Sequence, residues 1–196
     1  AISFYGEPVE KNFSQNKKLK QSKINTKQYQ KIIKENDLNK LIMDLNKKSI
    51  ISVDTETSSL DPQVAELIGI SLSYAENISF YIPVGHKNTK GLNKDFVVKK
   101  LKPILEDPSI KKVGQNIKYD FIILKKYGVE LNSVEDTMLL SYTLDAGNNR
   151  HNMDTLSELH LNHKTISYKD LVGSGKKQLK FSEVDIDKAT EYAAED

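Results

Sequence analysis

The feature that most constrains this 196-residue chain is an apolar run that leads directly into two acids. The run Ile50-Ile51-Ser52-Val53 is mostly β-branched, which is typical of a buried strand. Side chains alternate across a strand, so Asp54 and Glu56 are expected on one face and Thr55 on the other. Two adjacent carboxylates at the end of a buried strand repel each other and resist the loss of water. The pattern therefore predicts a cation between them.

The rest of the chain predicts an α/β fold. Residues 50–56, 66–75 and 78–84 are expected to form an antiparallel meander, and residues 26–47 to form one or two short helices broken near Asn36-Asp37. A further short strand is expected at residues 111–114. Helices are predicted at residues 93–106, 117–127, 136–146, 153–162 and 168–172, and from about residue 185 onward. This order favours a mixed sheet covered by helices.

Composition narrows the function classes. The chain has no cysteine, which excludes disulfides, zinc–thiolate sites and cysteine nucleophiles. Its net charge of +2 is too small to indicate a nucleic-acid binder by itself. No apolar run approaches the ~20 residues needed to span a bilayer, so no membrane contact is expected. Residues 1–23 are rich in lysine and poor in apolar anchors, which predicts a linker or flexible arm, and residues 24–196 form the folded domain.

Two further acids have helical partners. Asn116 and Asp120 are four residues apart at a predicted helix start, and Tyr192 and Asp196 are four apart near the end of the chain. Taken singly, each pair has an ordinary structural explanation, such as an ion pair between Asp120 and a lysine. Taken together with the two strand acids, they suggest an all-oxygen site that suits Mg²⁺ or Mn²⁺, and a pair of such ions supports phosphoryl displacement.

These motifs resemble those of the DEDD 3′→5′ exonucleases, in the subclass with tyrosine in the third motif. The resemblance is closest to the proofreading domains of bacterial DNA polymerase I, of the family A or Klenow type, and extends over residues 24–196. It implies a ribonuclease-H-like fold with an antiparallel meander and parallel strands in one sheet, flanked by helices. Four stretches carry it: Asp54-Thr55-Glu56-Thr57-Ser58-Ser59-Leu60, Val113-Gly114-Gln115-Asn116-Ile117-Lys118-Tyr119-Asp120, Arg150-His151-Asn152-Met153-Asp154-Thr155-Leu156 and Tyr192-Ala193-Ala194-Glu195-Asp196.

The resemblance implies two-metal hydrolysis that releases deoxynucleotides from single-stranded or frayed DNA 3′ ends. One ion would be bound by Asp54, Glu56 and Asp196 and would activate water. The other would be held by Asp54 and, largely through water, by Asp120, and would stabilise the leaving oxygen. Tyr192 would orient the attacking water, because a tyrosine with a pKa near ~10 is a poor base at neutral pH.

Five residues are expected to bind the DNA strand. Leu60 would wedge near the terminal bases, while Gln115 and Asn116 would contact the terminal nucleotide. Arg150 would meet a backbone phosphate, and Tyr168 would offer a face on which a base stacks. For Leu60 and Tyr168, plain packing in a turn or in the core is the alternative.

Partners and context follow from the same resemblance. It implies a monomer in the bacterial cytoplasm, associated with the nucleoid, with a polymerase domain following in the intact protein.

Because the chain stops at Asp196 within a predicted helix, we expect it to be truncated there and weakly active in isolation. Two alternatives are a non-catalytic DNA-end-binding module with this fold and a stand-alone 3′→5′ exonuclease acting on RNA. His151, His160 and His163 are expected to be structural or surface residues.

Overall fold

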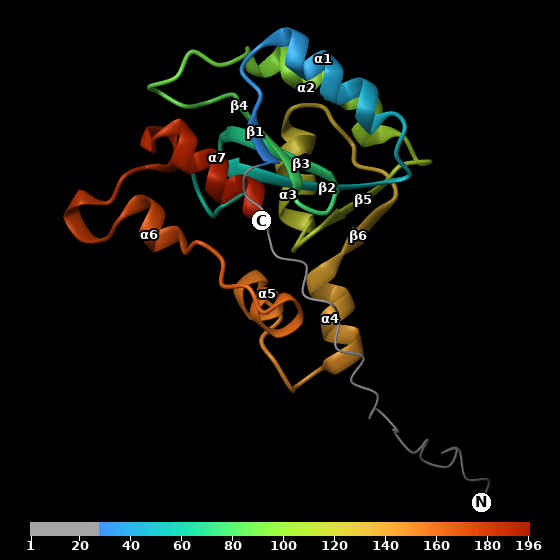
Figure 1. Ribbon diagram of the computed structural model, residues 1–196, viewed down its shortest axis with the longest axis vertical. Coiled ribbons are helices and arrows are strands. Elements are labelled where there is room, and N and C mark those ends of the chain that lie inside the picture. Colours follow the sequence, from blue (N-terminus) through green and yellow to red (C-terminus); the bar gives the residue numbers. More distant parts are fainter. Residues whose placement is uncertain (1–27) are drawn as a thin grey trace, which may run out of the picture.

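The computed structural model describes residues 28–196, which form one six-stranded sheet with helices on both faces (Figure 1). The flexible arm expected at residues 1–23 lies outside the described residues. The strands are β1 (Tyr29–Lys31), β2 (Ile50–Thr57), β3 (Leu67–Ala75), β4 (Ile78–Pro83), β5 (Lys111–Gly114) and β6 (Val134–Asp136). The helices are α1 (Glu35–Leu45), α2 (Lys94–Glu106), α3 (Lys118–Lys126), α4 (Thr137–Asp145), α5 (Met153–Leu161), α6 (Tyr168–Val172) and α7 (Ile186–Glu195).

The sheet is mixed, as the sequence predicts. Its strand order is β1-β4-β3-β2-β5-β6. The pairs β2–β3 and β3–β4 are antiparallel, which confirms the expected meander, and the other three pairs are parallel. The central strand β2 pairs with β3 along most of its length but with β5 only from Ile50 to Ser52. The acidic end of β2 therefore has an open edge on the β5 side.

The two faces of the sheet are covered differently. The larger core packs α1, α2 and α3 on the face that receives Ile51 and Val53 of β2. The opposite face, here called the α7 face, carries a smaller cluster that includes Tyr81, Phe181 and Ala193. Figure 1 shows α4 and α5 extending away from the sheet beyond β6. Leu161, the last residue of α5, lines one pocket together with Asp54 of β2. The site is thus bounded by the sheet, α7 and this extension.

The structure differs from the sequence prediction at two short strands. One or two short helices with a break near Asn36-Asp37 are expected within residues 26–47; α1 confirms one helix, while the break is wrong and the described residues before α1 are not α-helical. Residues 29–31 instead form the edge strand β1 beside β4, and a strand of three residues is too short to show a period of two. Asn36 and Asp37 lie in the first turn of an unbroken helix, where an acid is favourable near the positive end of the helix dipole. Strand β6 was missed because it merges directly into α4.

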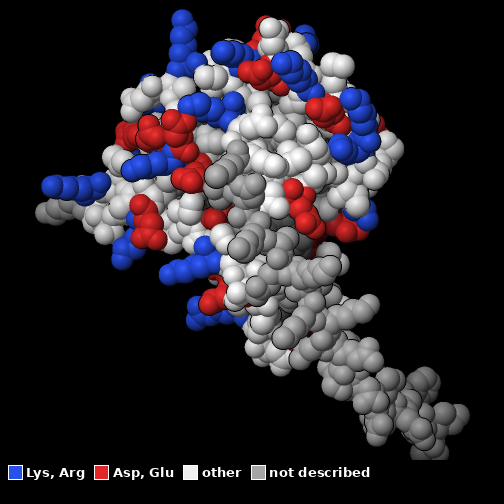
Figure 2. All heavy atoms as spheres, viewed as in Figure 1, with Lys and Arg blue, Asp and Glu red and all other residues white. Residues whose placement is uncertain are grey.

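The surface has no single dominant charge on the visible side. Figure 2 shows lysine and arginine side chains scattered among acidic ones over this face, in keeping with the small net charge. Among the described residues, no helix combines the length and the apolar character needed to cross a bilayer.

Candidate active site

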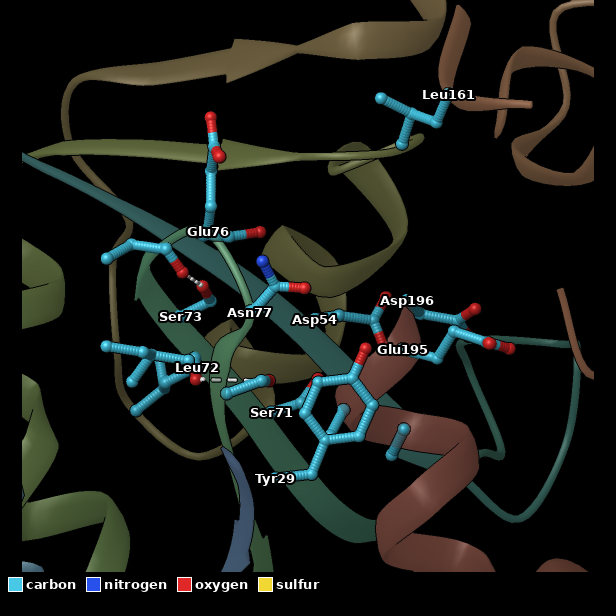
Figure 3. Close-up of a pocket in the computed structure, with 16 residues that line it drawn as sticks. Tyr29, Asp54, Ser71, Leu72, Ser73, Glu76, Asn77, Leu161, Glu195 and Asp196 are labelled. Atoms are coloured by element: carbon cyan, nitrogen blue, oxygen red, sulfur yellow. Dashed lines mark hydrogen bonds between the residues drawn. The ribbon is translucent and has the colours of Figure 1, made fainter. Parts of the chain in front are cut away.

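Three acids meet at the end of β2. Asp54 and Glu56 project from the α7 face of the strand, and Asp196 follows the last turn of α7. One carboxylate oxygen from each lies within 4.8 Å of the other two. Ala193 and Ala194 are buried, so this end of α7 can approach the sheet closely. Figure 3 shows Asp54 and Asp196 side by side in a pocket of about 310 Å³.

The fourth acid, Asp120, reaches the site from the other side of the sheet. It lies in the first turn of α3 and is 3% exposed. Its Oδ1 accepts hydrogen bonds from the Thr55 backbone N–H at 2.9 Å and from the Thr55 hydroxyl at 2.6 Å. Thr55 lies beyond the last β2–β5 residue pair, so its N–H is available to α3. Asp120 is therefore fixed across the open edge of β2, beside the three clustered acids and not among them.

Crowding and burial make these acids hard to ionise without a cation. Burial raises the pKa of Asp54 to about 6, and burial together with the Asp54 charge raises the pKa of Asp120 and of Asp196 to about 8. The pKa of Glu56 is raised well above its usual value by burial and by the charges of its acidic neighbours.

One oxygen of this cluster lacks a partner. Within the described part of the chain, Glu56 Oε1 is buried and has no hydrogen-bond partner, which is rare for a carboxylate. A set of carboxylate oxygens with an unused buried lone pair fits a hard divalent cation such as Mg²⁺ or Mn²⁺. Asp54, Glu56 and Asp196 are the residues that could hold it directly.

The floor of the site depends on a glycine. Gly69 of β3 pairs with Glu56, and the Tyr81 ring lies across it. A Cβ atom at residue 69 would come within 2.2 Å of the Tyr81 ring, so only glycine fits. The Tyr81 hydroxyl is hydrogen-bonded to His86 Nε2 at 2.8 Å. This packing fills the space behind Glu56 with an aromatic ring.

Tyr192 lies one turn before Asp196 in a group of aromatic rings. Its ring centroid is 6.2 Å from that of Tyr168 and 6.1 Å from that of Phe181. Burial raises the pKa of Tyr192, and the charges of Asp196 and Glu56 raise it further. The hydroxyl therefore stays protonated at neutral pH and can donate a hydrogen bond into the site. Tyr168 is 46% exposed, so its ring retains an open face.

Leu60 projects from an anchored loop. The carbonyl oxygen of Ser59 accepts hydrogen bonds from the Thr57 hydroxyl at 3.0 Å and from the Tyr119 hydroxyl. These bonds connect the loop to β2 and to α3. The Leu60 side chain is nevertheless 95% exposed. Leu60 is therefore an almost fully exposed apolar residue on a loop that is hydrogen-bonded to the protein at Ser59.

Gln115 and Asn116 form the turn between β5 and α3. Gln115 Nε2 donates to the backbone oxygen of His151 at 2.7 Å, and Gln115 Oε1 accepts from the Thr137 hydroxyl. Asn116 has φ +57°, a left-handed conformation that asparagine tolerates better than most residues. The amide of Gln115 therefore fixes the loop that carries Arg150. Arg150 itself is exposed.

Some hydrogen bonds that fix the site could not be predicted from the sequence patterns. Strand alternation indicates only that Thr55 faces away from the two acids, and gives no sign that it holds Asp120. Tyr119 adjoins Asp120 in sequence, but its hold on the Leu60 loop depends on a contact across 60 residues. Spacing rules do not predict such long-range hydrogen bonds.

Comparisons with known proteins identify the family of this chain. A family model described as 3′–5′ exonuclease matches residues 29–196. DNA polymerase I of Rhizobium leguminosarum is 45% identical over 179 residues, which cover 81% of this chain and 18% of that protein. DNA polymerase I of Pseudomonas aeruginosa is 42% identical over 158 residues, which cover 78% of this chain and 17% of that protein. The chain therefore spans less than a fifth of the length of these curated relatives.

Solved nucleases share the fold. Escherichia coli RNase D, an exoribonuclease, superposes with a TM-score of 0.63 at 22% identity, covering 86% of this chain and 41% of that one. Brucella melitensis NrnC with bound Mg²⁺ superposes with a TM-score of 0.59 at 21% identity, covering 85% of this chain and 72% of that one. At these identities the similarity establishes the fold alone, and it confirms the ribonuclease-H-like architecture expected from the sequence.

Proposed function

Because the chain belongs to the family of 3′–5′ exonuclease domains of DNA polymerase I, we propose that it removes deoxynucleotides from single-stranded or frayed DNA 3′ ends in a reaction that needs divalent metal ions. In the intact protein it would be the proofreading part, joined to a polymerase domain. The observation that carries the proposal is the convergence of Asp54, Glu56 and Asp196 oxygens within 4.8 Å, with Glu56 Oε1 unpaired among the described residues.

The acids provide the metal-binding part of this proposal. Asp54, Glu56 and Asp196 would hold one ion, and Asp54 would share a second with Asp120, largely through water. Bound Mg²⁺ or Mn²⁺ would supply an acidified water and would neutralise the charge that develops on the phosphate and the leaving oxygen. Thr55 occupies only one oxygen of Asp120, so the other is available for a water-mediated contact.

Tyr192 orients the attacking water in this proposal. A tyrosine whose pKa is raised by burial and by neighbouring acids cannot serve as a base at neutral pH. Its hydroxyl can still donate a hydrogen bond and select one orientation of the water. Proton removal from that water then depends on the bound cations and on the carboxylates.

The surrounding residues would hold the DNA end. Tyr168 stacks on a base through its open face, and the exposed Arg150 contacts a phosphate. Gln115 and Asn116 contact the terminal nucleotide from the β5–α3 turn, and Leu60 lies against the terminal bases. Stacking does not depend on base identity, so this arrangement suits an enzyme that must accept any mispaired end.

A nuclease assay tests the proposal. We expect the chain to shorten a 5′-labelled single-stranded DNA stepwise from its 3′ end with Mg²⁺ or Mn²⁺, to release deoxynucleoside monophosphates, and to be inactive with EDTA. A single-stranded RNA of the same sequence serves as the comparison substrate. Faster cleavage of the RNA would favour a stand-alone RNA exonuclease. Binding of DNA ends without cleavage in either metal would indicate a non-catalytic end-binding module.

Replacing Leu60 with alanine tests the expected wedge. We expect cleavage of a duplex with a frayed 3′ end to fall about tenfold, because the side chain no longer separates the terminal bases, whose unpairing costs a few kcal/mol. Cleavage of single-stranded DNA should change less. The control is Met43→Ala, a second exposed apolar residue, on helix α1. Equal losses on both substrates would contradict the role of a wedge.

A further inference from the structure

Glu195 makes an unusual pair of contacts beside the acidic cluster. It is the last residue of α7 and directly precedes Asp196. Its Oε1 accepts a hydrogen bond from His163 Nε2 at 2.7 Å, and its Oε2 accepts one from the backbone N–H of Ile166. The Glu195 side chain is only 6% exposed. Both of its oxygens thus hold one short segment, residues 163–166, against the end of α7.

Residue 195, at the C-terminal end of α7, is an unfavourable position for an acid. The C-terminal end of a helix carries partial negative charge, so a carboxylate there is destabilising. Asp54 and Asp196 line the same pocket, so further acids lie close to Glu195. An acid at residue 195 therefore has a cost that its contacts to residues 163–166 must offset, since charge-assisted hydrogen bonds are the stronger kind.

The segment held in this way leads directly to Tyr168. Residues 163–166 connect α5 to α6, and Ser167 caps α6, whose first residue is Tyr168. A second contact, from the Thr165 hydroxyl to Asp154 at 2.7 Å, ties the segment back to α5. The Tyr168 ring lies 6.2 Å from that of Tyr192, one turn before Glu195 on α7. The contacts of Glu195 therefore connect the segment that leads to the exposed Tyr168 ring with the acid-bearing end of α7.

We propose that His163 and Glu195 are positioning residues, forming a clamp that keeps Tyr168 at the place where the 3′-terminal base stacks. This inference rests on the proposed exonuclease function and deepens it. His163 does not touch the DNA end. It acts by holding the α5–α6 connection through Glu195, so that the stacking ring and the acids on α7 meet the same nucleotide.

The test measures stacking and cleavage separately. The probe is a single-stranded oligodeoxynucleotide with 2-aminopurine as its 3′-terminal base, whose fluorescence falls when the base stacks. In EDTA, where no cleavage occurs, wild type should quench the probe and His163→Ala should quench it much less. In Mn²⁺, we expect His163→Ala to raise KM about tenfold, the effect of losing roughly one stacked base. The value of kcat should stay within about threefold, because the acids are unchanged.

Matched variants separate positioning from general damage. His163→Gln keeps a donor of similar reach and should restore quenching, while His160→Ala, in the last turn of α5, should behave as wild type. In a Tyr168→Ala background, His163→Ala should cause no further loss of quenching and no further rise in KM, because His163 acts through the Tyr168 ring. If His163→Ala alters the far-UV circular dichroism, His163→Asn, whose amide is too short to reach Glu195, replaces it.

The outcomes distinguish this inference from the proposed function. Wild-type quenching and KM in His163→Ala, or a loss that adds fully to that of Tyr168→Ala, would overturn the clamp. A wild-type chain that cleaves no DNA with either metal would overturn the proposed function, while the fluorescence signal would still report on the clamp.

Discussion

Replacing Asp54 with asparagine is expected to reduce the rate of 3′-nucleotide release at least about a thousandfold. Asp54 is the one acid that would hold both ions, and metal stabilisation of the transition state is worth several kcal/mol, which corresponds to a factor of this size. The change is measured as single-turnover cleavage of labelled single-stranded DNA in Mn²⁺. Folding should be unaffected, because the new side chain has the same shape and removes a repelled charge.

The control for this variant is Asp95→Asn. Asp95 is exposed in the first turn of α2, on the opposite face of the sheet, and its loss should cost only a few tenths of a kcal/mol of helix stability. Cleavage should stay at the wild-type rate. If Asp54→Asn still degrades DNA in a metal-dependent way at a rate near that of wild type, the site has been assigned to the wrong residues.

Without metal, the folded chain is expected to lose stability as pH rises from 7 to 9. Asp120 and Asp196 have pKa values of about 8 in the folded chain, well above the ordinary value of 3.8 that they regain on unfolding. A raised pKa means that the folded state holds protons that the unfolded state has released, so stability is lost as pH rises through the folded value. The free energy of unfolding should fall by about 2 kcal/mol, or roughly 5 °C in Tm.

Thermal unfolding in EDTA and in saturating Mn²⁺ measures this effect. The ion binds the ionised acids, so its Kd should be lower at pH 9 than at pH 7 and it should stabilise the chain more at pH 9. An ion present at 100 times its Kd raises the free energy of unfolding by about 2.7 kcal/mol in total. In EDTA, the Tm of Asp120→Asn should fall less between pH 7 and pH 9 than that of wild type, because one of the two titrating groups is gone. A Tm in EDTA that is constant or rises between pH 7 and 9 would contradict the crowding of these acids.

Most of the fold could be predicted because its elements carry strong local patterns. The strands of the β2–β4 meander are long and rich in apolar residues, and α3 ends before Gly128, whose φ of +76° suits glycine. The failures are the two strands of three residues. β1 and β6 form through pairing with β4 and β5, and pairing with a partner distant in sequence leaves no local signal.

The candidate site could be predicted in part. Strand alternation indicates that Asp54 and Glu56 share a face. The helical spacing expected between Asn116 and Asp120 is wrong, because Asn116 lies before α3 in a left-handed conformation. The assignment of catalytic and DNA-binding roles to these residues comes from the family motifs and stays a prediction. The contacts that fix the site, Thr55 to Asp120 and Glu195 to His163, join residues 65 and 32 positions apart, and only the folded chain brings them together.

The meeting of acids at the end of β2 also bears on how such domains evolve. Each of these carboxylates opposes folding in the absence of a cation, so the first one to mutate to a neutral residue leaves a sturdier protein. Loss of these acids is therefore the thermodynamically easy direction for such a domain, and keeping them costs stability that a bound cation returns.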